Sequence, residues 1–203
     1  MNKTLRTARR LGAVSLTLLA ALGLAGCAAD GPAGSPGYLL PATAAGQQYP
    51  HQLAVTVAAP RLAGHLDGEG IVMQLSDIEV YQARQHLWAE ELGGQLQQLL
   101  IRRLSSALPE SQVVGRGQPL LAGREVREIR VRLGRFQGRY DGVALAEGQW
   151  QLLAGDGTLL AQADFSAEQP LADDGYPALV RALAAAWEQV ADQLAARLAQ
   201  NAS

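Results

Sequence analysis

Cysteine and lysine are almost missing from this chain of 203 residues, which has one of each, Cys27 and Lys3. A single cysteine excludes an internal disulfide framework and any multi-cysteine metal site. Beyond the first ten residues the chain has 13 cationic side chains and 19 acidic ones, a net charge of −6. A protein of this charge lacks the phosphate-neutralising surface that holds nucleic acid, so no nucleic-acid partner is expected.

Recognisable catalytic and metal-binding motifs are missing as well. The histidines, His51, His65 and His86, have no partner at the spacing of metal ligands. There is no Gly-x-Ser-x-Gly nucleophile elbow. Glu90 and Glu91 could serve acid–base chemistry, but on a helix they would point about 100° apart. Favourable interaction with a helix N-terminus explains them better. The sequence therefore predicts no enzymatic activity, no metal and no cofactor.

The N-terminus has the organisation of an export signal. Four cations in the first ten residues precede residues 11–24, which are uncharged and mostly apolar. This run has the length of a signal-peptide core and is too short to span a bilayer comfortably. It ends in Leu24-Ala25-Gly26-Cys27, which resembles the bacterial lipobox, where a signal peptidase cuts before a cysteine that carries lipid. We therefore predict a signal peptide over residues 1–26.

Cys27 is the residue expected to carry the lipid, as an N-palmitoyl and S-diacylglycerol cysteine. At about 0.8 kcal/mol per buried CH₂, two or three acyl chains anchor a protein stably and one does not. The plainer alternative is that Cys27 is an unmodified residue at the end of a secretory signal. Ala28 follows, where lipoproteins of enteric type retained in the inner membrane usually have aspartate. The expected location is thus the periplasmic face of the outer membrane, with residues 27–37 as a flexible tether.

The remaining residues, 38–203, are expected to form a single compact domain of the mixed α/β (α+β) class. Apolar residues recurring at three- and four-residue steps predict helices over residues 85–108 and from Pro177 onward. Period-two alternation and turn residues predict about six short strands in a mixed sheet, the last three forming a meander. Seven segments are candidates for these strands: residues 52–59, 70–75, 77–81, 113–114, 129–133, 144–154 and 159–165.

Two features of this domain are candidate binding sites. Trp88 could contact a partner, although its position on the expected apolar line of a helix favours core packing. The stretch from Arg116 to Arg139 contains seven arginines and only two acidic residues, a local net charge of +5. Arg130 and Arg132 should share one strand face, either as solvated charges or as a contact with an acidic partner or phospholipid head groups.

Several of these segments together resemble the PqiC-type lipoproteins, also described as ABC-type transport auxiliary lipoprotein components (DUF330-like). The resemblance begins at Cys27 and the short segment 38–40 and continues through residues 57–72. It then includes Trp88-Ala89-Glu90-Glu91-Leu92 and the C-terminal amphipathic helix, and so covers nearly all of the mature chain. Leu87 departs from the family pattern, in which an arginine commonly precedes the tryptophan.

The resemblance implies a compact α/β fold and a non-enzymatic role in an envelope lipid-transport system. The implied partner is a membrane-anchored MCE-domain protein that forms a conduit across the periplasm. The lipoprotein would hold the outer-membrane end of that conduit, among outer-membrane lipids, and a homo-oligomeric ring would match a ringed partner. The alternative left open is a periplasmic carrier that itself holds a lipid or small molecule.

Overall fold

The structure, a computed structural model, describes residues 37–200. Cys27 and the expected signal peptide lie outside the described residues. Two long helices, α2 (Leu92–Ala107) and α3 (Tyr176–Gln200), and one 3₁₀ turn, η1 (Gly64–Leu66), accompany the strands. The strands are β1 (Gly37–Tyr38), β2 (Leu53–Val57), β3 (Arg61–Leu62), β4 (Gly70–Gln74), β5 (Val80–Trp88), β6 (Gln112–Gly115), β7 (Glu125–Arg139), β8 (Val143–Ala154) and β9 (Leu159–Pro170).

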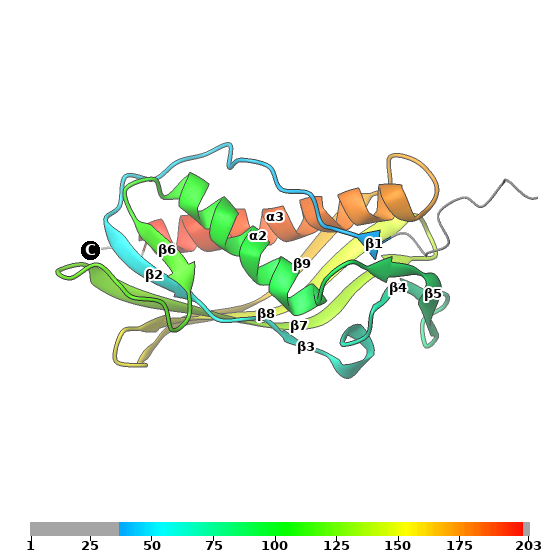
Figure 1. The fold of residues 1–203 in the computed structure, drawn as a ribbon, viewed down its shortest axis with the longest axis horizontal. Coiled ribbons are helices and arrows are strands. Elements are labelled where there is room, and N and C mark those ends of the chain that lie inside the picture. Colours follow the sequence, from blue (N-terminus) through cyan, green and yellow to red (C-terminus); the bar gives the residue numbers. More distant parts are fainter. Residues whose placement is uncertain (1–36, 201–203) are drawn as a thin grey trace, which may run out of the picture. The chain divides into compact units, whose positions relative to one another are not determined.

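All nine of these strands belong to one mixed sheet, as the expected fold class requires (Figure 1). Its main path runs β1-β5-β4-β7-β2-β6, with β3 and β8 also paired to β7, and β9 paired to β8. There are more strands than the six or so expected, mainly because β1 and β3 were not expected. Each of them has only two residues. The strand that follows α2, β6, pairs parallel with β2 and not with β5, the strand directly before the helix.

The predicted meander is confirmed: β7, β8 and β9 pair antiparallel in chain order. Its two turns contain Asp-Gly pairs whose glycines, Gly142 and Gly157, have φ of 80° and 89°. A side chain is strained at such angles, and glycine adopts them freely. The meander is therefore determined by short-range chemistry that the sequence displays directly.

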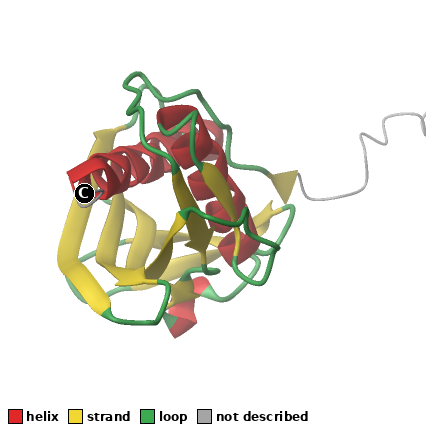
Figure 2. Cartoon of the chain, turned by 90° about the vertical axis from the view of Figure 1, so that its left-hand side faces the viewer, coloured by secondary structure: helices red, strands yellow, loops and turns green. Residues whose placement is uncertain are grey.

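The two helices lie together over one face of the sheet (Figures 1 and 2). The hydrophobic core fills the space between these layers, and Trp187 of α3 is fully buried within it. Its indole Nε1–H donates to the carbonyl oxygen of Leu96 in α2 at 2.9 Å, which satisfies the one polar atom of that ring. Phe136 of β7 packs edge-on against the same indole.

The first helix begins later than its pattern predicts, at Leu92 and not near residue 85. Residues 80–88 instead form β5, which pairs antiparallel with β4 and, at its end, parallel with β1. The three-residue spacing that suggested a helix is thus overridden by pairing with strands that are distant in sequence. The strand expected at residues 77–81 is correspondingly displaced toward the C-terminus.

The segment between β1 and β2 lies along the helices and is held by side chains from both of them. Thr43 donates from its backbone N–H and its hydroxyl to the Glu188 carboxylate, at 2.6 Å in each case. Arg103 donates to the carbonyl of Ala44 at 2.6 Å and forms a two-pronged ion pair with Asp192. The hydrogen bonds that Arg103 donates to Asp192 raise the pKa of its guanidinium. The stretch that follows the expected tether is thereby bound firmly to the domain.

Candidate functional site

Trp88 ends strand β5 and is a core residue with one edge at the surface, where it is 7% exposed. Its backbone N–H donates to the carbonyl of Glu69 at 2.7 Å, and its ring packs against Phe136 with centroids 6.3 Å apart. The expected helical position of Trp88 is wrong, whereas the expectation that it packs in the core agrees with this burial. A direct contact of Trp88 with a partner stays a prediction.

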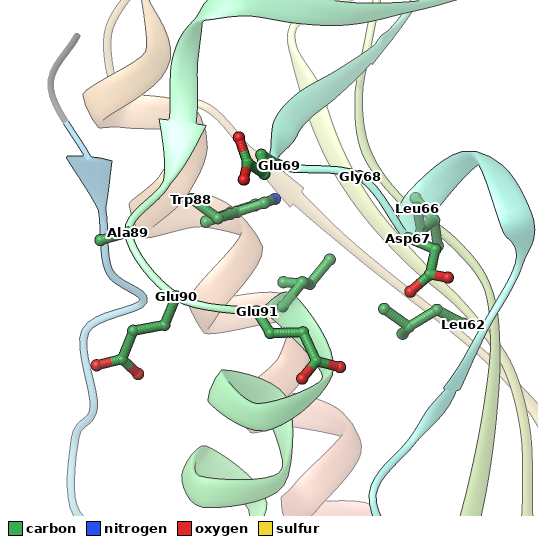
Figure 3. Close-up of a pocket in the computed structure, with 10 residues that line it drawn as sticks. Leu62, Leu66, Asp67, Gly68, Glu69, Trp88, Ala89, Glu90 and Glu91 are labelled. Carbon is green, nitrogen blue, oxygen red and sulfur yellow. The ribbon is translucent and has the colours of Figure 1, made fainter. Parts of the chain in front are cut away.

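A hollow of about 320 Å³ opens where Trp88 reaches the surface (Figure 3). Its apolar lining comes from Trp88 and three leucines, and its charged lining consists entirely of carboxylates. The four carboxylates are those of Asp67, Glu69, Glu90 and Glu91. They point in different directions, Glu90 away from Asp67, for example. The hollow therefore combines apolar side chains with negative charge, which suits a cationic or mixed side chain.

Glu91 occupies the N-cap position of α2, and Glu90 precedes it. Both carboxylates are exposed, and neither forms a side-chain cap. Their placement agrees with the electrostatic interpretation, since negative charge near the first turn is stabilised by the helix dipole. Within residues 37–200, no group of three or more His, Cys, Asp or Glu residues is arranged to hold a metal ion.

Arg130 and Arg132 project from the same face of β7, as their alternation with buried Val131 and Leu133 predicts. The helices cover the opposite face, so this pair lies on the uncovered outer face of the sheet. Both arginines line a second hollow, of about 570 Å³.

Two further arginines line this hollow. Sequence reasoning missed Arg61 of β3, and it counted Arg116, which follows β6, in the arginine-rich stretch without placing it in a site. Arg61 lies far from β7 along the chain and reaches it only because β3 pairs with β7. Gln149 and Gln151 of β8 complete the polar lining, and the rest is small or apolar: Ala58, Ala59 and Val131. We name this group of residues the arginine hollow.

Glu128 is the acidic residue that forms ion pairs with arginines of the arginine hollow. It accepts two hydrogen bonds from Arg130, at 2.7 and 3.2 Å, and lies 3.4 Å from the Nε of Arg116. The hydrogen bond from Arg130 is the main reason that the pKa of Glu128 lies below its ordinary value. A charged carboxylate thus fixes one side of the hollow near neutral pH.

The local arginine excess seen in the sequence is mostly neutralised by the fold. Glu125, Glu147 and Glu168 are among the acids that pair with Arg127, Arg135 and Arg139, respectively. Arg132 differs from these three, because its guanidinium makes no ion pair or hydrogen bond with any described residue. The positive potential is therefore concentrated at the arginine hollow and not spread along the whole strand.

The described domain thus carries two charged hollows, an acidic one beside Trp88 and a basic one on the outer face of the sheet. No helix in the described part of the chain is both long and apolar enough to cross a bilayer. Residues 38–195 match the family described as ABC-type transport auxiliary lipoprotein component. The chain belongs to this family.

Curated relatives and solved structures support that assignment. The chain is 34% identical over 183 residues to the intermembrane transport lipoprotein PqiC of Escherichia coli strain K12, covering 89% of this chain and 94% of that protein. The PqiC protein of Shigella flexneri matches equally well. A crystal structure of an uncharacterized protein, 31% identical, covers 78% of this chain and 99% of its own with a TM-score of 0.66.

A further solved structure bears on the fold alone. It is a DUF330 protein of Xanthomonas campestris that is 19% identical and superimposes with a TM-score of 0.69, covering 81% of this chain and 95% of its own. The mixed α+β architecture is therefore the family architecture, and the protein is an auxiliary lipoprotein of the intermembrane transport type.

Proposed function

We propose that this protein is a non-enzymatic outer-membrane lipoprotein that anchors the periplasmic conduit of an MCE-type lipid-transport system. The observation that carries the proposal is the 34% identity, over 89% of the chain, to proteins named as intermembrane transport lipoproteins. Sequence conserved at that level across a whole domain supports a shared general role. The conduit protein, the lipids of the outer membrane and a ring of identical copies are the partners proposed.

The anchor supports this role through effective concentration. Cys27 lies ten residues before Gly37, where the described domain begins, so an extended tether spans at most about 35 Å. A domain restricted to so thin a layer beneath a membrane meets a conduit tip far more often than a free one would. Even a weak contact through a surface hollow can then be well occupied.

The test is affinity purification of the full-length lipoprotein from gently cross-linked envelopes, followed by mass spectrometry of what accompanies it. Recovery of an MCE-domain protein is the expected result, with the mass of the purified complex reporting whether the lipoprotein forms a ring. A Cys27→Ala variant is the matched control, since it retains the folded domain and removes the proposed anchor. Recovery of unrelated envelope proteins alone from the wild type would contradict the proposal.

The carrier alternative has less support from the packing. A lipid carrier of this architecture would hold an acyl chain between its helices and its sheet, but Trp187, Phe136 and Leu183 fill that space and are at most 1% exposed. The hollows described above lie at the surface instead. Lipid co-purified stoichiometrically with a Cys27→Ala variant would favour the carrier.

A further inference from the structure

Two arginines of the arginine hollow stand directly opposite each other on neighbouring strands. In the parallel pairing of β3 with β7, Arg61 is the register partner of Arg132. Both side chains are exposed, and neither guanidinium pairs with an acid in the described part of the chain. Like charges held side by side repel each other, so an anion bound between the two guanidinium groups would relieve this repulsion.

No described acid is close enough to form an ion pair with either arginine. Arg132 also lines a neighbouring hollow with Glu147 and Asp164, but Glu147 pairs with Arg135, and Asp164 accepts a hydrogen bond from Gln149 at 2.9 Å. Glu128 is engaged with Arg130 and Arg116, the two other arginines of the group. Arg61 and Arg132 are therefore the two arginines of the hollow that have no ion pair with a described residue.

The hollow has room for a small tetrahedral anion. Apart from its arginines and glutamines, it is lined by Ala58, Ala59 and the buried Val131, so none of these other residues fills it with a long side chain, and its volume of about 570 Å³ admits a phosphate group. Guanidinium groups present planar forks of donors that match the oxygens of phosphate in pairs. Arg130 is already oriented by its two hydrogen bonds to Glu128, which reduces the ordering cost of binding.

We propose that the arginine hollow binds a phosphate group, presented either by a phospholipid head group or as free phosphate. A phosphate offers more acceptor oxygens than a single protein carboxylate, so it can satisfy Arg61 and Arg132 together with the remaining donors of Arg116. Free phosphate and the phosphomonoester of phosphatidic acid also carry more negative charge than a carboxylate. The concave setting favours a single inserted group over the broad contact that an acidic protein surface would make. The proposal does not depend on the identity of the transport partner.

The test is isothermal titration calorimetry of the full-length lipoprotein in neutral detergent micelles. The probes are inorganic phosphate, the water-soluble dihexanoyl phosphatidic acid, dihexanoyl phosphatidylcholine and a glutamate-rich peptide. Binding of inorganic phosphate or phosphatidic acid is expected, and the tighter of the two identifies the source of the phosphate. Absence of binding by both, or tighter binding of the acidic peptide, would overturn the proposal.

Matched variants distinguish a specific phosphate site from nonspecific attraction of phosphate to the arginines of the protein surface. Arg61→Gln combined with Arg132→Gln should weaken phosphate binding at least about tenfold. The control pair, Arg102→Gln combined with Arg135→Gln, removes the same charge elsewhere and should leave the affinity within about twofold. Glu128→Gln should strengthen binding several-fold, because it removes a negative charge beside the site while its amide oxygen can still accept a hydrogen bond from Arg130. Equal weakening by both double variants would refute the site, and thermal melts confirm that each variant is folded.

Discussion

Glu128 shows at the scale of a single residue how the fold assigns a role that composition does not reveal. In the sequence it is one of two acids among seven arginines. In the structure it is mostly shielded, binds Arg130 through both carboxylate oxygens and lies beside Arg116. A carboxylate in this position both orders two arginines and limits the positive charge of the arginine hollow.

The lowered pKa of Glu128 predicts an acid-dependent loss of stability. Because the folded state favours the charged carboxylate, unfolding takes up a proton in the acid range. The stabilisation is therefore present above the ordinary pKa of about 4.5 and is lost as the pH falls through the lowered folded-state value. Urea unfolding of the wild type and of Glu128→Gln should differ most near pH 7 and converge toward pH 3. A difference that does not change with pH would contradict this assignment.

Trp88 shows that the sequence around one residue can predict its burial without predicting the element in which it lies. Its spacing to Leu92 and Leu96 fits a helix, and its burial was expected on that ground. The residue is indeed buried, but at the end of a strand, because β5 pairs with both β4 and β1. Hydrophobicity alone was enough to predict burial, whereas the element was decided by pairing partners that are remote in the chain.

At the scale of elements, the segment between β1 and β2 is the connection through which the domain would be held to its anchor. Arg103 of α2 and Glu188 of α3 have side chains only 11% and 12% exposed, and both bind Thr43 of this segment. Removing one partner of a largely buried pair leaves the other without compensation. This network therefore joins both helices to the connecting segment.

We expect Arg103→Gln to lower the free energy of unfolding by about 2–3 kcal/mol, less than for a fully buried pair because Asp192 is nearly half exposed. The same variant should increase amide hydrogen exchange at Thr43 and Ala45, whose N–H groups are held by Glu188 and Ser106. Arg102→Gln, at an exposed neighbouring position, is the control and should stay within about 0.5 kcal/mol. Unchanged exchange at Thr43 in the Arg103 variant would show that the network does not hold the segment.

At the scale of the whole molecule, we expect the location of the protein to depend on two adjacent residues, Cys27 and Ala28. Wild-type protein is expected in the outer-membrane fraction, with an acyl mass on the N-terminal peptide. Cys27→Ala should lose that mass. A chain that begins at Ala28 behind a cleavable secretory signal should enter the aqueous phase in detergent partitioning, because the acyl chains are the proposed anchor. Ala28→Asp should keep the lipid and move to the inner membrane, which separates anchoring from sorting. Membrane partitioning of the chain that begins at Ala28 would count against the anchor.

The sequence by itself determined the family, the mixed fold class, the antiparallel meander and the buried face of each long helix. These features depend on short-range patterns: an ordered set of motifs, Asp-Gly turns, and repeats of two or of three to four residues. Only the tertiary structure decided where α2 begins, how Arg103 binds the connecting segment and which arginines share a hollow. Arg61 meets Arg132 through pairing of β3 with β7, and the partner of a strand depends on how the entire sheet is ordered, which no local spacing specifies.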